Sequence, residues 1–219
     1  MKDESTSPQD SLNAQQQAIL LIAAYAAAGD MDVLDGVLDQ GLDAGLSISS
    51  AREVFTQLYA YAGFPRSLNA LATLMQKVET RKAQGMVDEP GPEPAHEIPK
   101  GDDLRATGTA NQSQLVGQPV QGAIFDFAPA IGEYLQSHLF GAIFERDNLD
   151  WKHRELATVG MLSAIPGAEA QLKAHMGMSL NTGITNAQLE AAVKVLQSRA
   201  DQAFATRASD ALQQLLTSR

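Results

Sequence analysis

A glutamate and a histidine on two consecutive predicted helices are the residues of this chain best suited to acid–base chemistry. Glu155 and His175 lie in the segment LDWKHRELATVGMLSAIPGAEAQLKAHMGMSLNTGIT, residues 149–185. Each falls on the apolar face of its helix; Val159 and Leu162, for example, follow Glu155 at i+4 and i+7. If the two helices form an antiparallel hairpin, the side chains can meet. Such a pair can hold a proton near neutral pH and pass it on.

The same two residues could instead form a structural hydrogen bond that joins the helices, and spacing alone leaves both interpretations open. The sequence contains no cysteine, which removes a thiolate nucleophile, a disulfide and a Cys-ligated metal. It also lacks a His-x₃-His or Glu-x-x-His pattern, a glycine-rich phosphate loop and a Gly-x-Ser-x-Gly elbow. We therefore expect no metal site.

Composition narrows the class of partner. The 219 residues carry a formal net charge of −10, which argues against nucleic acid and against an anionic membrane surface. The polar start, MKDESTSPQD, has no apolar run of signal-peptide length, and the apolar stretch Ala18–Ala28 is too short to cross a bilayer. These features predict a cytoplasmic location, although a chain whose signal peptide had been removed would look the same.

Helix is predicted throughout, and the fold class is all-α. Proline, glycine and polar residues fill 85–114, which indicates a linker or mobile loop, with a lid or an arm around a neighbouring subunit as the alternative. The hairpin that carries Glu155 and His175 begins at Asp150, an N-cap residue type, and its first helix ends before Pro166. The expected helices cover about 13–28, 31–44, 50–62, 66–84, 124–144 with a break near Pro129, 150–164, 168–181, 186–198 and 203–216.

The chain contains an internal repeat. The turns DAGLS (43–47) and NTGIT (181–185) share a pattern in which a glycine ends one helix and a hydroxyl residue caps the next. The offset between Gly45 and Gly183, 138 residues, pairs the helices of the two halves without gaps. When the two halves are aligned in this way, Gln17 corresponds to Glu155 and Val37 corresponds to His175. The proton-handling pair therefore occurs once per chain.

Several motifs resemble the carboxymuconolactone decarboxylase family, which shares its all-helical fold with alkylhydroperoxidase D. RELATVG (154–160) resembles the family's Arg-Glu-Leu helix, and LKAHMGMSLNTGIT (172–185) resembles its histidine helix and the turn after it. In the first half, GLSISSAREVFTQLYAYAGFP (45–65) resembles the stretch that follows the same turn. The implied organisation is a disordered leader (1–11), a first repeat (12–84), the linker (85–114) and a second repeat (115–219).

Two departures from the family pattern bear on function. The peroxidase branch carries Cys-x-x-Cys shortly before the histidine, where this chain reads GAEAQ (167–171), so thiol peroxidase activity is excluded. The halves are also complementary, because only the second has the Glu–His pair and only the first keeps YAGFP. We expect them to pack as a pseudo-dimer with one composite pocket. Its catalytic residues would be His175 and Glu155, and its substrate-binding candidates are Arg154, Glu53, Tyr59 and Tyr61.

The resemblance implies a cofactor-free lyase or isomerase that acts on a small carboxylated lactone or organic acid, most simply a carboxy-lyase. His175 would deliver a proton to carbon, and Glu155 would orient it. A lactone hydrolase could use the same pair. The alternative is a non-catalytic helical binding or assembly protein that retains the fold. The resemblance also implies a homo-oligomer. Single-copy members of the family form rings of dimers, and a chain that fuses two copies would need half as many subunits, which favours a trimer.

Overall fold

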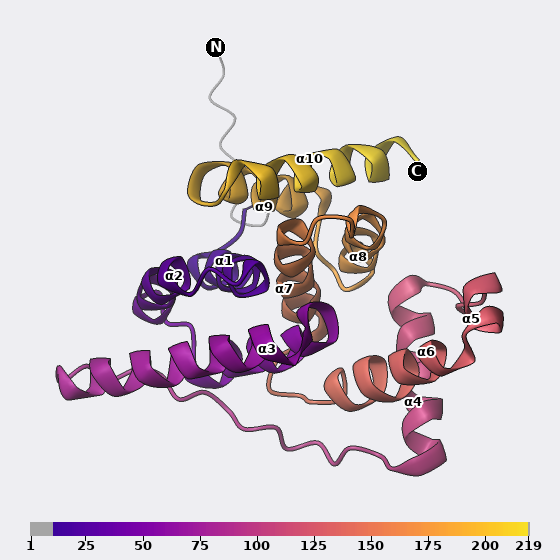
Figure 1. Cartoon of the computed structure of the whole chain (residues 1–219), viewed down its shortest axis with the longest axis horizontal. Helices are drawn as coiled ribbons and strands as arrows, with labels where there is room; N and C mark the ends of the chain where they lie inside the picture. Colours follow the sequence, from indigo (N-terminus) through magenta and orange to yellow (C-terminus); the bar gives the residue numbers. More distant parts are fainter. Residues whose placement is uncertain (1–10, 219) are drawn as a thin grey trace.

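The computed structural model describes residues 11–218, and every regular element in this range is a helix. The predicted leader, residues 1–11, falls outside the described part of the chain except for Ser11. Figure 1 shows a main body of helices and, to its right, an arm that contains α4, α5 and α6. The elements are α1 (Ala14–Ala28), α2 (Met31–Asp43), α3 (Ile48–Ala83), α4 (Gly101–Val116), α5 (Ala123–Phe127), α6 (Pro129–Tyr134), the π-helix η1 (Leu135–Ile143), α7 (Trp151–Ala164), α8 (Glu169–Asn181), α9 (Asn186–Arg199) and α10 (Gln202–Thr217).

Local signals set most helix ends. Asp150 caps α7 by accepting a hydrogen bond from the His153 backbone N–H at 2.8 Å, as predicted. Gly45 and Gly183 take φ values of 82° and 91°, the left-handed conformation that glycine adopts without steric cost. The next helices then begin at hydroxyl caps, Ser47 and Thr185. Each of the two turns therefore has the glycine conformation and the hydroxyl cap that the sequence predicts.

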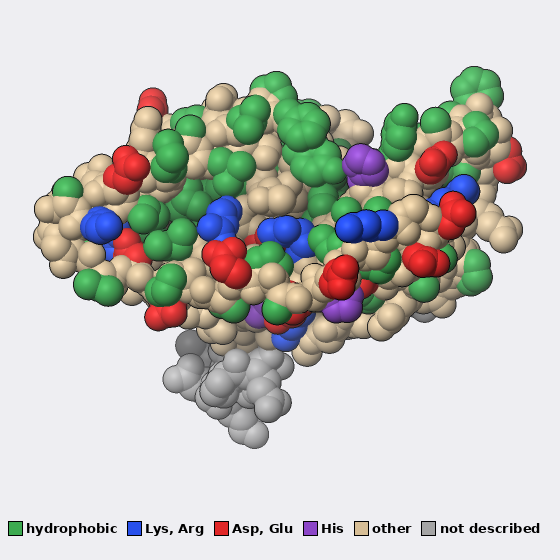
Figure 2. All heavy atoms as spheres, turned by 90° about the horizontal axis from the view of Figure 1, so that it is seen from below, with side chains coloured by type: hydrophobic (Ala, Val, Ile, Leu, Met, Phe, Trp, Pro, Cys, Tyr) green, Lys and Arg blue, Asp and Glu red, His purple; other side chains and the backbone are tan. Residues whose placement is uncertain are grey.

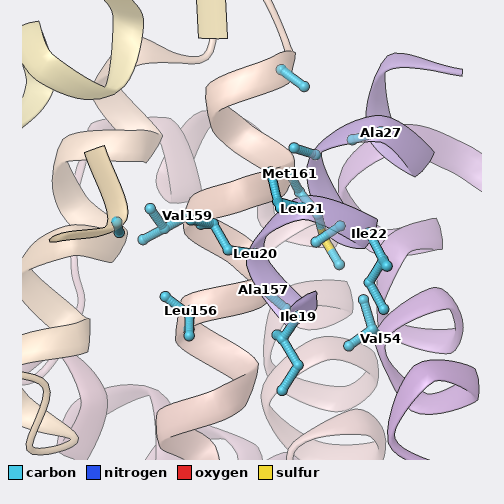
Figure 3. Close-up of a cluster of buried hydrophobic side chains, with 14 of the residues drawn as sticks. Ile19, Leu20, Leu21, Ile22, Ala27, Val54, Leu156, Ala157, Val159 and Met161 are labelled. Carbon is cyan, nitrogen blue, oxygen red and sulfur yellow. The ribbon is translucent and has the colours of Figure 1, made fainter. Parts of the chain in front are cut away.

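The centre of the body is the contact between α1 and α7, the most extensive between any two helices (Figure 3). Leu20, Ile22 and Met161 are completely or almost completely buried there. The helices touch backbone to backbone, because a Cβ built on Gly160 would lie 2.3 Å from the Leu20 carbonyl oxygen. Burial of this apolar surface is the main force that holds the two halves of the chain together.

Replacing Gly160 by alanine should therefore separate α1 from α7. We expect Gly160→Ala to lower the free energy of unfolding by about 1–3 kcal/mol, because overpacking against backbone cannot be relieved by a side-chain rotation. The measurement is urea unfolding followed by circular dichroism. Gly36→Ala is the matched control: a Cβ there meets no atom within 4 Å, so it should gain up to about 1 kcal/mol from helix propensity. Equal stability of the two variants would contradict the close contact.

The helix bounds repeat with the predicted offset of 138 residues. Shifted by that amount, α2 coincides with α8, and the start of α3 falls on the start of α9. The shift also carries Gly63, where α3 is kinked (φ 80°, ψ 162°), onto Asp201 between α9 and α10. The sequence predicts two helices here, 50–62 and 66–84, and the kink separates them. The matching bounds support an ancestral duplication, while the pseudo-dimer stays a proposal.

The structure differs from the sequence prediction over residues 85–114. Residues 86–100 form neither helix nor strand, and part of this segment lies against the start of α3, where the Ile48 and Ser49 backbone N–H groups donate to Glu89 and Pro90 carbonyl oxygens. Residues 101–116 form helix α4, which the predicted linker or mobile loop did not include. The helix lacks a clear apolar stripe, because it buries polar groups instead: the Asn111 side chain donates to the Phe140 carbonyl oxygen at 2.8 Å.

The pairing of α4 with η1 builds the arm. A Cβ on Gly108 would lie 1.7 Å from the Gln136 carbonyl oxygen, so the two backbones are in direct contact. Phe140 and Phe144 belong to a second, smaller hydrophobic cluster, which also includes Leu115 of α4. Within residues 11–218, none of the helices is both long and apolar enough to cross a lipid bilayer.

Candidate active site

The Glu155–His175 pair is formed. Helices α7 and α8 bring the His175 Nδ1 atom to 2.8 Å from Glu155 Oε2. Glu155 is completely buried and His175 is 7% exposed. The hydrogen bond occupies Nδ1, so Nε2 is the nitrogen left to exchange a proton with a substrate. The predicted hairpin therefore places a buried carboxylate behind an imidazole that is just within reach of solvent.

Tyr61 is the third member of this cluster. Its ring meets the His175 ring edge to face, with centroids 5.6 Å apart. The Tyr61 hydroxyl and Glu155 Oε1 are both buried and have no hydrogen-bond partner in the described part of the chain. Burial, reinforced by the charge of Glu155, raises the pKa of Tyr61 above its ordinary value, so the hydroxyl stays protonated; the nearby Thr158 and Arg154 oppose this shift without cancelling it. A donor and an acceptor thus lie unpaired beside His175, which is the kind of exception that calls for a polar ligand or water.

Glu53 and Arg154 bind each other. Arg154 Nη2 donates to Glu53 Oε1 at 2.9 Å, and both side chains are fully buried. Arg146 Nε also donates to Glu53 Oε1, at 2.8 Å, and Asn148 Nδ2 donates to Oε2 at 3.2 Å. Burial pushes the pKa of Glu53 upward, but the hydrogen bond from Arg146 and the charge of Arg154 outweigh it, so the pKa lies below its ordinary value. The network holds α3, α7 and the loop before α7 together.

A substrate-binding role for Glu53 and Arg154 stays a prediction. The hydrogen bonds that Glu53 and Arg154 make are to other protein groups. One donor remains, because Arg154 Nε is buried without a partner in the described part of the chain. Arg146 and Asn148 were not predicted from the sequence, because they lie in a loop without periodicity. Neither was Gln57, which follows Glu53 by one helical turn and donates to the Thr158 hydroxyl oxygen at 2.8 Å across the α3–α7 contact. The i+4 spacing of Gln57 was the one available signal.

Tyr59 lies apart from the Glu–His pair. It stacks on Phe64 with ring centroids 4.6 Å apart, and its hydroxyl is 3.4 Å from His138 Nδ1. Together with Ile131 and Leu135 it lines a pocket of about 330 Å³ between α3 and the arm. Figure 2, which shows the molecule from below, has hydrophobic side chains over both the body and the arm, with Lys and Arg side chains spread across the middle of this face. Tyr61 is therefore the tyrosine that the structure places at the candidate site.

The arm approaches the same region from the other side. Leu115, on α4, accepts a hydrogen bond through its carbonyl oxygen from Asn181 Nδ2 at 2.7 Å. Met178, one turn after His175, packs with Tyr61 against the small hydrophobic cluster of the arm. The arm therefore contacts the body through residues that follow His175 on α8. Among residues 11–218, no group of three histidines and carboxylates is arranged to hold a metal ion.

Comparison with known proteins finds a family match in the second half of the chain. Residues 129–214 match the model of the carboxymuconolactone decarboxylase family. The matched range runs from α6 into α10 and includes both Glu155 and His175. A search of curated proteins finds no match.

Proposed function

Because residues 129–214 carry the carboxymuconolactone decarboxylase family domain, we propose that the protein is a decarboxylase-like enzyme that acts on a small carboxylated lactone or organic acid. The observation that carries the proposal is the buried Glu155–His175 hydrogen bond of 2.8 Å, with the unpaired Tyr61 hydroxyl beside it. Such a pair supplies proton transfer without needing an organic cofactor or a thiol.

The proposed reaction begins with cleavage of the bond between the substrate carboxylate and its α-carbon. The bonding electron pair stays on the substrate as a dienolate, and carbon dioxide leaves. Protonated His175 then donates the Nε2 proton to carbon and becomes neutral, with the remaining proton on Nδ1 held by Glu155. Solvent returns the proton to Nε2 for the next cycle. Glu155 therefore fixes the tautomer and orientation of the imidazole.

Tyr61 is suited to stabilise the charge that develops on the substrate. Its hydroxyl is protonated and unpaired, and its ring lies against His175. As negative charge develops on the substrate oxygen in the transition state, a hydrogen bond from Tyr61 to that oxygen becomes stronger than it was to the neutral lactone.

The homo-oligomer, with a trimer favoured, also stays a prediction. Exposed apolar residues on α3 and on the arm, among them Phe64, Leu68 and Phe127, offer a surface for it.

Incubation of the wild-type protein with carboxylated unsaturated γ-lactones in D₂O tests the proposal. We expect release of one carbon dioxide per substrate and incorporation of one deuterium at a dienolate carbon, either the one that lost the carboxylate or the one next to the lactone carbonyl, as followed by NMR. Isomerisation or hydrolysis of the lactone without release of carbon dioxide would contradict decarboxylation and identify the protein as a lactone isomerase or hydrolase. Binding without turnover of any carboxylated lactone would refute the enzyme and favour the non-catalytic binding protein.

A further inference from the structure

The repeat places a counterpart of the candidate active site in the first half. The 138-residue offset pairs Tyr61 with Arg199, Glu155 with Gln17 and His175 with Val37. The packing follows the same correspondence, since α3 contacts α7 and α9 contacts α1. Arg199 Nη1 donates to Gln17 Oε1 at 3.2 Å, so the counterparts of Tyr61 and Glu155 also face each other. These three counterparts include no group that can exchange a proton near neutral pH.

A groove of about 420 Å³ occupies this counterpart location. Asp32, Gly36 and Gln40 follow one another at i+4 spacing along the same face of α2 and form one side of it. Leu21 of α1 and Val37 form a buried apolar floor. Gly36 keeps the groove open because it has no side chain to fill it. A Cβ built at this position would lie in open space, with no atom within 4 Å.

One end of the groove presents an arginine without an acidic partner. Arg199 donates to Gln17 and, through Nη2 at 2.6 Å, to Gln40, and both acceptors are neutral amides. No ion pair involves Arg199 in the described residues, although the chain as a whole carries a net charge of −10. The Tyr25 hydroxyl donates to the Arg199 carbonyl oxygen at 3.2 Å and so fixes the end of α9. A carboxylate is a stronger acceptor for this guanidinium than either amide.

The other end of the groove is acidic. Asp32 also makes no ion pair among the described residues, and it precedes Gln40 by eight positions on α2, a rise of about 12 Å. The apolar floor lies between the two charged ends. A molecule complementary to this arrangement is elongated, with an anionic end, an aliphatic middle and a hydrogen-bond donor or cation at the far end.

We propose that this groove is a second, non-catalytic binding site for an ω-amino or ω-hydroxy carboxylate, whose carboxylate binds Arg199 and whose opposite end binds Asp32. The site contains neither Glu155 nor His175, so it is independent of the proposed enzymatic function. Occupancy would join α1, α2 and α9 and thereby stabilise the contact between the two halves of the chain.

The probe is 6-aminohexanoate, titrated into the full chain and followed by the backbone amide shifts of Gly36 and Gln40. We expect saturable shifts with a Kd of about 1 mM, appropriate to a ligand of this size. Hexanoate, which lacks the amine, and hexylamine, which lacks the carboxylate, should each bind at least about tenfold more weakly. No saturable shift at about 50 mM probe would overturn the proposal.

Three variants assign the contacts. Arg199→Gln should weaken 6-aminohexanoate and hexanoate by about tenfold and leave hexylamine unchanged. Gly36→Leu should abolish binding of all three probes without unfolding, since the added side chain enters open space on a helix. Lys82→Gln, an exposed charge elsewhere on the molecule, is the matched control and should bind as wild type. Equal binding by wild type and Gly36→Leu would refute the site.

One further variant separates this inference from the proposed enzyme. His175→Gln should bind 6-aminohexanoate as wild type does, because His175 lies at the other, paired location. Loss of the Gly36 and Gln40 shifts in His175→Gln would place the probe at the candidate active site and overturn the second site.

Discussion

His175→Gln is expected to lower kcat for decarboxylation by a factor of about 10²–10⁴ with little change in KM. Glutamine keeps a polar side chain but cannot hold an exchangeable proton on a ring nitrogen, so the dienolate must take its proton from water. Steady-state rates of carbon dioxide release provide the measurement. His96→Gln is the matched control, since that histidine lies outside the site and its side chain is 51% exposed. A His175→Gln enzyme with wild-type kcat would remove His175 from the mechanism.

A stability comparison separates the catalytic role from a structural one. His175→Leu leaves the buried Glu155 carboxylate without its partner and should cost about 1–3 kcal/mol. Adding Glu155→Leu removes the unpaired charge and should recover much of that loss without recovering activity. A purely structural pair would show the same recovery in stability, but the single variants would keep the turnover of the wild type. Activity and stability must therefore be measured on His175→Leu, on Glu155→Leu and on the double variant.

Glu53→Gln is expected to destabilise the fold by about 3–5 kcal/mol, the largest effect on stability that the structure predicts. The carboxylate receives charged hydrogen bonds from Arg154 and Arg146, and Arg154 is fully buried. A neutral amide would leave that arginine without a countercharge. Urea unfolding measures the loss. Glu79→Gln, an exposed position on the same helix, should change stability by no more than about 0.5 kcal/mol.

The same network sets a dependence on pH. Because the folded-state pKa of Glu53 lies below its ordinary value, the carboxylate contributes stability that is fully present above its unfolded pKa of about 4.3. That contribution is lost as the pH falls through the lower, folded-state pKa. Wild type and Glu53→Gln should therefore differ most at neutral pH and converge below about pH 4. A constant difference down to about pH 2 would show that the charge of Glu53 is not what stabilises the fold.

Sequence determined the features of this protein that depend on near neighbours in the chain. The caps at Asp150, Ser47 and Thr185 and the left-handed glycines between helices follow from residue types within one turn. So does the amphipathic placement of Glu155 and His175 on consecutive helices. The residue pattern therefore indicated that the two side chains can meet if the helices form an antiparallel hairpin, and the structure shows that they do.

Tertiary structure alone decided the groups that come together across long stretches of chain. Arg146 and Glu53 are 93 residues apart, and Asn148 lies in a loop without periodicity, so no local pattern predicted the buried ion network. Helix α4 is stabilised by its backbone contact with η1 and by buried polar groups rather than by an apolar stripe, which is why sequence patterns indicated a linker. The choice of Tyr61 over Tyr59 at the site likewise depends on how α3 rotates as it packs against α7, because residues two apart on a helix face nearly opposite directions.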